Sequence, residues 1–127
     1  MTTDPIANFL TKIRNAVQGR KDLVMDSYSN LKNSIAEIMM RHKFVSDAKV
    51  DEEDGKKVLV LHLNPERHDL NVKRVSKPGQ RIYVGWKDMH RVRNGLGVGI
   101  YSTSQGVLTD REARKLKIGG EYICEIY

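Results

Sequence analysis

Apolar residues recur at helical spacing in two stretches of the first half of the chain, which predicts two amphipathic helices. Asp4 can cap the first helix, Pro5 suits its first position because no N–H is needed there, and Gly19 ends it. The second helix is predicted from Ser29 to His42. The two apolar faces consist of Ile6, Phe9, Leu10, Ile13 and Val17, and of Leu31, Ile35, Ile38 and Met39. We expect both faces to form core rather than a cofactor site.

The segments around these helices have a different pattern. Residues 20–28 are predicted to be a charged connector with a short apolar piece. Residues 45–52 and 58–63 are predicted to be the two strands of a hairpin, because Asp54-Gly55 between them is a strong turn signal.

The second half of the chain is predicted to be mainly β. Residues 64–69 are polar and turn-rich, so we expect a boundary there between a lobe of residues 1–64 and a lobe of residues 65–127. The fold class is therefore α+β with two small lobes: an N-terminal α/β lobe, with two helices packed on a short sheet, and a C-terminal mainly β lobe with one short helix. The strands expected in the second lobe are 70–75, 81–84, 98–103 and 121–126.

Turns and one helix connect these strands. Residues 76–79 are predicted to form a type II turn and residues 104–106 another turn. One helical turn is expected within residues 87–93. Thr109 and Glu112 fit a capping box, which predicts a short helix ending near Leu116.

Positive charge is concentrated in the second lobe. The chain of 127 residues has a net charge of +6, from 22 Lys and Arg against 16 Asp and Glu. Residues 1–63 hold 10 basic and 9 acidic side chains, whereas residues 64–127 hold 12 and 7, so the net charges are +1 and +5. Within residues 73–93 only Asp88 opposes seven basic residues. Such a field favours a polyanion, although a basic face kept for solubility is the alternative.

The composition excludes several classes of protein. No run of eighteen apolar residues occurs, so no membrane span is expected, and the N-terminal residues lack the pattern of a signal peptide. The single cysteine, Cys124, rules out an internal disulfide and suits a reducing compartment, either the cytosol or an organelle matrix.

No arrangement of residues indicates catalysis, a metal or a cofactor. The glycines at 95–99 lack the third glycine of a dinucleotide-binding loop, because Ile100 takes its place. Ser102 and Ser104 stand in no nucleophile elbow. His62 is expected to be a core histidine rather than a ligand, and the histidines are scattered at His42, His62, His68 and His90. We therefore expect no enzyme and no cofactor.

Two segments offer chemistry suited to RNA. Residues 102–106 (Ser102, Thr103, Ser104, Gln105 and Gly106) place hydroxyls, an amide and a glycine on one loop, where they can contact phosphates, 2′-hydroxyls and base edges. The other segment offers positive charge, a rigid turn and an aromatic ring for stacking through Lys77, Pro78, Gly79, Arg81 and Tyr83. The alternative is that the loop is an ordinary turn and Tyr83 belongs to the core.

Several motifs together resemble the small-subunit ribosomal protein eight family over essentially the whole chain. The loop and following helix at residues 102–116 resemble the family's signature most closely. The other matching segments are 4–7, 10–16, 74–83, 91–97 and 119–121.

The resemblance implies a two-lobed protein that binds the central domain of small-subunit ribosomal RNA early in assembly and helps to build the platform. It implies that Ser102–Gly106 is the main RNA contact. Its matching motifs add Arg91, Asn94, Gly120 and Glu121 to the candidate contacts, and the family's use of the N-terminal lobe adds Thr3, Asp4, Arg14, Ser29 and Lys32. It also implies a place in the ribosome in the cytoplasm, or in an organelle matrix. The implied partners are neighbouring small-subunit proteins, five and twelve, and the messenger of its own operon. The alternative is a free-standing RNA-binding translational regulator, or a processing enzyme, on a similar scaffold.

Three positions depart from the family's pattern. Gln105 stands where relatives often have a basic residue, so one phosphate contact is missing. Residues 26–29 read Asp-Ser-Tyr-Ser where the family usually has Val-Pro-x-Ser. The link at residues 64–69 lacks the tyrosine-glycine turn common in relatives.

Overall fold

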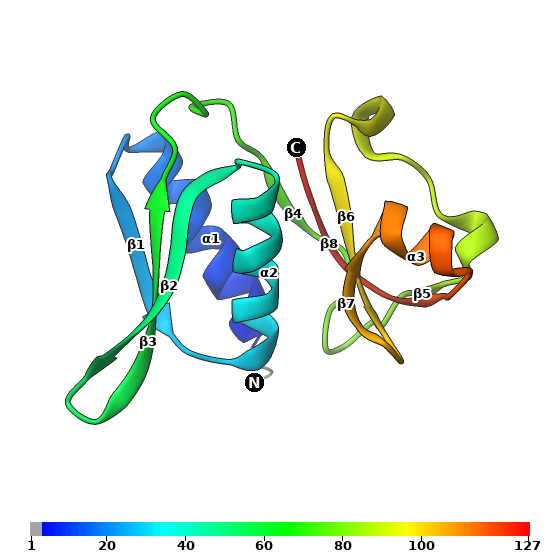
Figure 1. Ribbon diagram of the computed structural model, residues 1–127, viewed down its shortest axis with the longest axis horizontal. Coiled ribbons are helices and arrows are strands. Elements are labelled where there is room, and N and C mark those ends of the chain that lie inside the picture. Colours follow the sequence, from blue (N-terminus) through cyan, green and yellow to red (C-terminus); the bar gives the residue numbers. More distant parts are fainter. Residues whose placement is uncertain (1–3) are drawn as a thin grey trace. The chain divides into compact units, whose positions relative to one another are not determined.

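The computed structural model describes residues 4–127, so the candidate Thr3 lies outside the described residues. The chain forms two compact units (Figure 1). One unit is Asn8–Leu70, and the other combines Asn71–Tyr127 with the described residues before Asn8. Each unit is described by itself below. No helix within residues 4–127 has the length and apolar character needed to cross a membrane.

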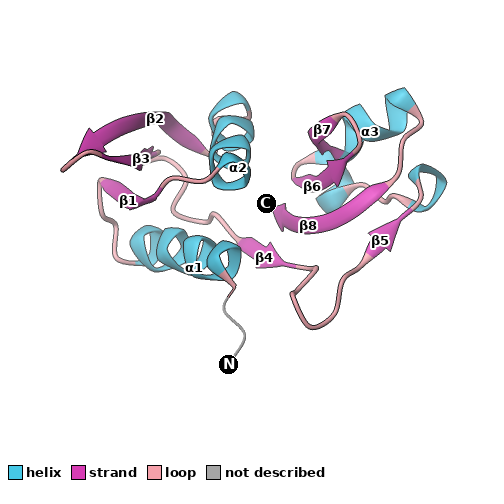
Figure 2. Cartoon of the chain, turned by 90° about the horizontal axis from the view of Figure 1, so that it is seen from below, coloured by secondary structure: helices cyan, strands magenta, loops and turns pink. Residues whose placement is uncertain are grey.

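The first unit is a three-stranded antiparallel sheet with two helices on one side (Figure 2). The strand order is β1-β3-β2, so β3 is central. Along β1, Val24 is buried, whereas Leu23 and Met25 on the opposite face are exposed. The elements are α1 (Pro5–Gln18), whose first three residues count with the other unit, β1 (Leu23–Ser27), α2 (Asn30–Arg41), β2 (Val45–Glu53) and β3 (Lys56–Leu63).

The local signals in the sequence explain both helices. The Asp4 carboxylate accepts a hydrogen bond from the Ala7 N–H at 3.1 Å, and the Ser29 hydroxyl accepts one from the Lys32 N–H at 3.2 Å. These are N-caps at the predicted positions. The apolar stripe of α1 is buried as expected, with Phe9 and Ile13 fully enclosed.

The expected connector at residues 20–28 is wrong, because Leu23–Ser27 forms the edge strand β1. Only Val24 of its five residues is buried, and an edge strand with one buried side chain shows little hydrophobic periodicity. His62 was expected to be a core histidine, but its side chain is only half-buried because it lies on the sheet face opposite the helices.

The second unit is built around the C-terminal strand. Strand β8 pairs with β4, β5 and β6, and β7 extends the sheet beyond β6. Its elements are β4 (Val72–Arg74), β5 (Tyr83–Val84), β6 (Val98–Thr103), β7 (Gly106–Thr109), α3 (Asp110–Leu116), β8 (Gly120–Ile126), and the 3-10 helices η1 (Trp86–Asp88) and η2 (Val92–Gly95). Thus β6 and the capping box of α3 are confirmed, whereas β4 and β5 are shorter than predicted.

Three local predictions for this unit need correction. Residues 106–109 form strand β7, whereas the sequence predicts only a turn that ends at Gly106 and a helix cap at Thr109. Residues 87–93 contain parts of two 3-10 helices instead of one helical turn. Residues 77–80 form a turn, but Gly79 does not adopt the positive φ that a type II turn requires.

Candidate nucleic-acid interface

A row of three residues crosses the sheet of the second unit. Tyr83 of β5 pairs with Glu121 of β8, which pairs in turn with Ser102 of β6. Directly opposed residues in a sheet project from the same face, so the sheet brings these three predicted contacts together. Tyr83 is 72 % exposed, and the alternative that it belongs to the core is therefore wrong.

The turn next to Ser102 is held by a threonine hydroxyl. Thr103 Oγ1 accepts a hydrogen bond from the Gln105 N–H at 3.1 Å and donates one to the Gly106 carbonyl at 2.8 Å. Gly106, which pairs with Thr103 across the two-residue loop, has φ 105°, a positive φ that glycine adopts without strain. The Thr103 side chain therefore stabilises the conformation of the turn.

The side chains of Ser104 and Gln105, at the tip of the turn, do not stabilise it. Ser104 and Gln105 are exposed, and within residues 4–127 their side chains make no hydrogen bond. The Ser104 hydroxyl and the Gln105 amide can therefore offer their donors and acceptors to a ligand. Gln105 offers no charge, so a phosphate contact by a basic side chain is absent at this position.

Gly120 lets strand β8 approach the base of the same turn. A Cβ atom at Gly120 would lie 2.4 Å from the Ser102 carbonyl oxygen and 2.9 Å from the Thr103 methyl carbon. A larger residue would push β6 away at the point where it enters the turn. The structure thus supports a positioning role for Gly120, and its direct contact with RNA stays a prediction.

Glu121 connects this row to the basic segment before β5. Its Oε2 accepts hydrogen bonds from Ser76 Oγ at 2.6 Å and from Arg81 Nη1 at 3.0 Å. Burial raises the pKa of Glu121, but the bonds from Ser76 and Arg81 outweigh burial, so the pKa lies below its ordinary value. Ser76 also accepts the Ile82 N–H at 3.0 Å, which fixes the chain just before Tyr83.

The turn of Lys77, Pro78 and Gly79 lies beyond this network. Lys77 and Gln80 exchange backbone hydrogen bonds of 3.0 Å, which closes the turn. Asp4, at the start of α1, lines a shallow depression with this turn. The Asp4 carboxylate also pairs with Arg74, with Nε to Oδ2 at 3.1 Å. Asp4 is thus engaged within the unit, both with Arg74 and as a helix cap.

Arg91 and Asn94 lie on a separate, exposed turn. Arg93 and Asn94 both adopt left-handed backbone conformations, with φ 50° and 56°. The Arg93 guanidinium stacks 4.3 Å from the centre of the Tyr127 ring. The turn is therefore well defined, and Arg91 and Asn94 are presented to solvent from it.

The three candidates in the first unit differ in accessibility. Arg14 is exposed on α1, and Ser29 is half-buried with its hydroxyl engaged in capping α2. Lys32 is only 4 % exposed. Its ammonium group lies 3.3 Å from Asp26 Oδ2 and 3.1 Å from Ser27 Oγ, so Lys32 holds β1 and α2 together.

Neither the cysteine nor the possible metal ligands in the described residues form a reactive site. Cys124 is fully buried, and burial raises the pKa of its thiol to about 12. In residues 4–127 no three histidine, cysteine or acidic side chains converge to hold a metal ion. Exposed hydroxyl, amide, aromatic and cationic groups on the strands and loops of one sheet instead indicate a nucleic-acid-binding module.

Comparison with known proteins agrees with this class. A family profile described as ribosomal protein S8 matches residues 4–127. The chain is 46% identical to the small ribosomal subunit protein uS8 of Thermus aquaticus, with both chains covered completely. It is 47% identical to uS8 of Streptococcus agalactiae serotype V, with 98% of both chains covered. The chain belongs to the ribosomal protein S8 family. The family is structural and non-enzymatic, so the prediction that this chain is no enzyme is confirmed.

Proposed function

We propose that the chain is a structural constituent of the small ribosomal subunit and binds ribosomal RNA through the exposed face of its second unit. The observation that carries this proposal is the alignment of Tyr83, Glu121 and Ser102 across three strands, next to the turn at residues 103–106. A base can stack on the Tyr83 ring while the hydroxyl and amide groups of Ser104 and Gln105 reach its edges or a 2′-hydroxyl.

The basic side chains around this face are suited to contact phosphates of the RNA backbone. Lys77 and Arg91 are exposed and offer their charge to phosphates, whereas Arg81 is paired with Glu121. Contacts to phosphates position a protein on RNA without reading sequence, whereas contacts to bases and sugars specify the site. The face thus combines cations for affinity with Tyr83 and Ser104 for recognition.

Family membership supports finer statements within this proposal. The RNA is the central domain of small-subunit ribosomal RNA, bound early in assembly of the platform. The neighbouring proteins are small-subunit proteins five and twelve. The protein acts in the ribosome of the cytoplasm or of an organelle matrix. The lobe boundary proposed at residue 64 falls six residues before the point where the described units divide. Ser29 and Arg14 of the first unit supply a smaller part of the contact.

Binding to a transcript of the central domain tests this function. Tyr83→Leu should weaken specific binding by about 1–3 kcal/mol because the stacked ring is lost, whereas Tyr83→Phe keeps the ring and should bind almost as wild type. Tyr83 is exposed, so neither variant should lower the melting temperature. Equal affinities for wild type and Tyr83→Leu would remove this face from the proposal.

The same RNA-binding face also suits a free-standing translational regulator that binds the messenger of its own operon. Sedimentation of a cell lysate distinguishes the two functions. A ribosomal constituent co-migrates with small subunits at a one-to-one ratio, whereas a free-standing regulator stays in the light fractions.

A further inference from the structure

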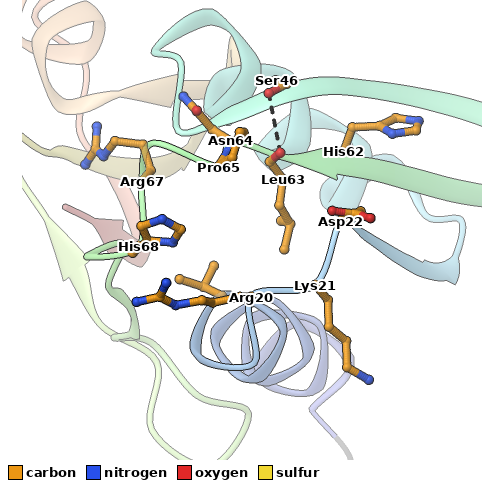
Figure 3. A pocket seen from close by; sticks show the side chains of 11 residues that line it. Arg20, Lys21, Asp22, Ser46, His62, Leu63, Asn64, Pro65, Arg67 and His68 are labelled. Atoms are coloured by element: carbon orange, nitrogen blue, oxygen red, sulfur yellow. Dashed lines mark hydrogen bonds between the residues drawn. The ribbon is translucent and has the colours of Figure 1, made fainter.

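A basic cavity of about 270 Å³ opens on the first unit, at the end of α1 and beside the loop that follows β3 (Figure 3). None of the RNA contacts expected from the sequence lines it. Its lining has three cations against one carboxylate, a net charge of +2 with neutral histidines. These charged groups and the two histidines are Arg20, Lys21, Arg67, His62, His68 and Asp22.

The end of α1 fixes Arg20 in this cavity. The Arg20 N–H donates to the Val17 carbonyl at 3.1 Å, and the Lys21 N–H donates to the Ala16 carbonyl at 2.9 Å. These two bonds form a Schellman end, in which one residue takes a left-handed conformation. That residue is Arg20, with φ 54°. Two backbone hydrogen bonds therefore fix the conformation of the chain from which the guanidinium projects.

Two donors from different segments line one side of the cavity. Figure 3 shows the Arg20 guanidinium and the His68 ring on the same side, with the Asp22 carboxylate beyond the Leu63 side chain. The single carboxylate thus lies away from the pair of donors. An anion next to Arg20 and His68 would meet N–H groups rather than Asp22.

Arg67 adds charge to the rim of the cavity. Its guanidinium stacks 4.8 Å from the centre of the Phe44 ring, and its Nε lies 3.4 Å from Asp69 Oδ1. The Asp69 side chain is 82% exposed, so water screens this ion pair. The positive potential of Arg67 is therefore only partly cancelled at the cavity.

We propose that this cavity binds a phosphate group of an RNA backbone, as a contact separate from the face around Tyr83. A guanidinium beside an imidazole N–H matches the several acceptor oxygens of a phosphate, and arginine is suited to that geometry. The ligand is RNA because the proposal rests on the RNA-binding function proposed above. The first unit then contacts RNA through a local basic site, although its overall charge of +1 gives no indication of such a site.

The test is the salt dependence of binding to a central-domain transcript, for Arg20→Gln and for a matched control. Lys43→Gln removes the same charge from the same unit, and Lys43 also has a left-handed backbone, at the end of α2, with φ 61°. A lost phosphate contact should make the slope of log affinity against log salt shallower by about one. Arg20→Gln should then lose about fourfold less affinity than wild type between 50 and 200 mM salt, while Lys43→Gln follows wild type.

The outcomes separate this proposal from the function on which it rests. If wild type does not bind the transcript, the proposed function fails. If wild type binds and the slopes of Arg20→Gln and Lys43→Gln are equal, the cavity proposal is overturned and the function stands. Should Arg20→Gln unfold, the pair Arg20→Gly and Lys43→Gly replaces it, since glycine suits a left-handed backbone. A response of the His68 ring resonances to inorganic phosphate, with an unchanged slope for the Arg20 variant, would assign free phosphate instead and overturn the proposal.

Discussion

Two neighbouring hydroxyls in the turn at residues 103–106 should respond to removal in opposite ways. Thr103 holds the turn through two hydrogen bonds, whereas Ser104 is exposed and makes none within residues 4–127. Thr103→Val should therefore lower stability, and Ser104→Ala should lower RNA affinity without affecting the fold. The two substitutions are closely matched, because each removes one hydroxyl from adjacent positions.

The structure sets the size of both effects. Each net hydrogen bond contributes about 0.5–1.5 kcal/mol, and the two bonds of Thr103 are exposed, so Thr103→Val should cost about 1–2 kcal/mol. Ser104→Ala should leave the free energy of unfolding within about 0.5 kcal/mol of wild type. If its hydroxyl bonds a base edge or a 2′-hydroxyl, specific binding should weaken by roughly 1–2 kcal/mol, which is about 5- to 30-fold.

The assay measures the melting temperature and two dissociation constants for each variant, one for the central-domain transcript and one for an unrelated duplex RNA. Binding of Ser104→Ala to the unrelated duplex should hardly change, because phosphate contacts dominate that affinity. A stable Ser104→Ala protein that prefers its cognate RNA as strongly as wild type would refute the recognition role of the turn. An unchanged melting temperature for Thr103→Val would refute the structural part of the reasoning.

Three further predictions concern RNA binding, thermal stability and the dependence of stability on pH. Cys124→Val should keep RNA binding, as measured on the central-domain transcript, because the fully buried thiol has no chemical role. Lys117→Gly should raise the melting temperature modestly, since Lys117 ends α3 with φ 57° and a left-handed residue costs about 1–2 kcal/mol, partly offset by its favourable charge at the helix end. The lowered pKa of Glu121 means that its stabilising effect is present above its ordinary pKa near 4.5 and is lost as pH falls through the lowered value. Glu121→Gln should flatten that part of a pH–stability curve, and equal acid slopes for both proteins would contradict this.

The sequence contained enough to predict the elements that carry strong local signals. The caps at Asp4, Ser29 and Thr109 begin their helices as expected, because each supplies an oxygen to an N–H of the first turn. Strand β6 was predicted with its observed bounds, since its apolar residues are buried on both faces. The same reasoning failed for β1 and β7, which are short and contain few buried side chains.

Only part of the candidate site could be predicted from the sequence. The loop at 102–106 and Tyr83 could be proposed from residue chemistry and resemblance, but their alignment through Glu121 depends on the pairing of β5 and β6 with β8. Strand pairing between residues far apart in the chain leaves no local signal. The cavity of Arg20 and His68 was missed for the same reason, because its donors come from segments nearly fifty residues apart.

Charge counted along the chain overstates the charge that a ligand meets. Of the seven basic residues in 73–93, Arg74 donates to Asp4 and to the Ile123 carbonyl at 2.8 Å, and Arg81 is paired with Glu121. These pairs hold the loop before β5 in place, and so they position Tyr83 instead of adding to the external field. Lys77, exposed on its turn, remains directed at solvent. The basic segment therefore has two functions, since part of it builds the face and the rest attracts the polyanion to it.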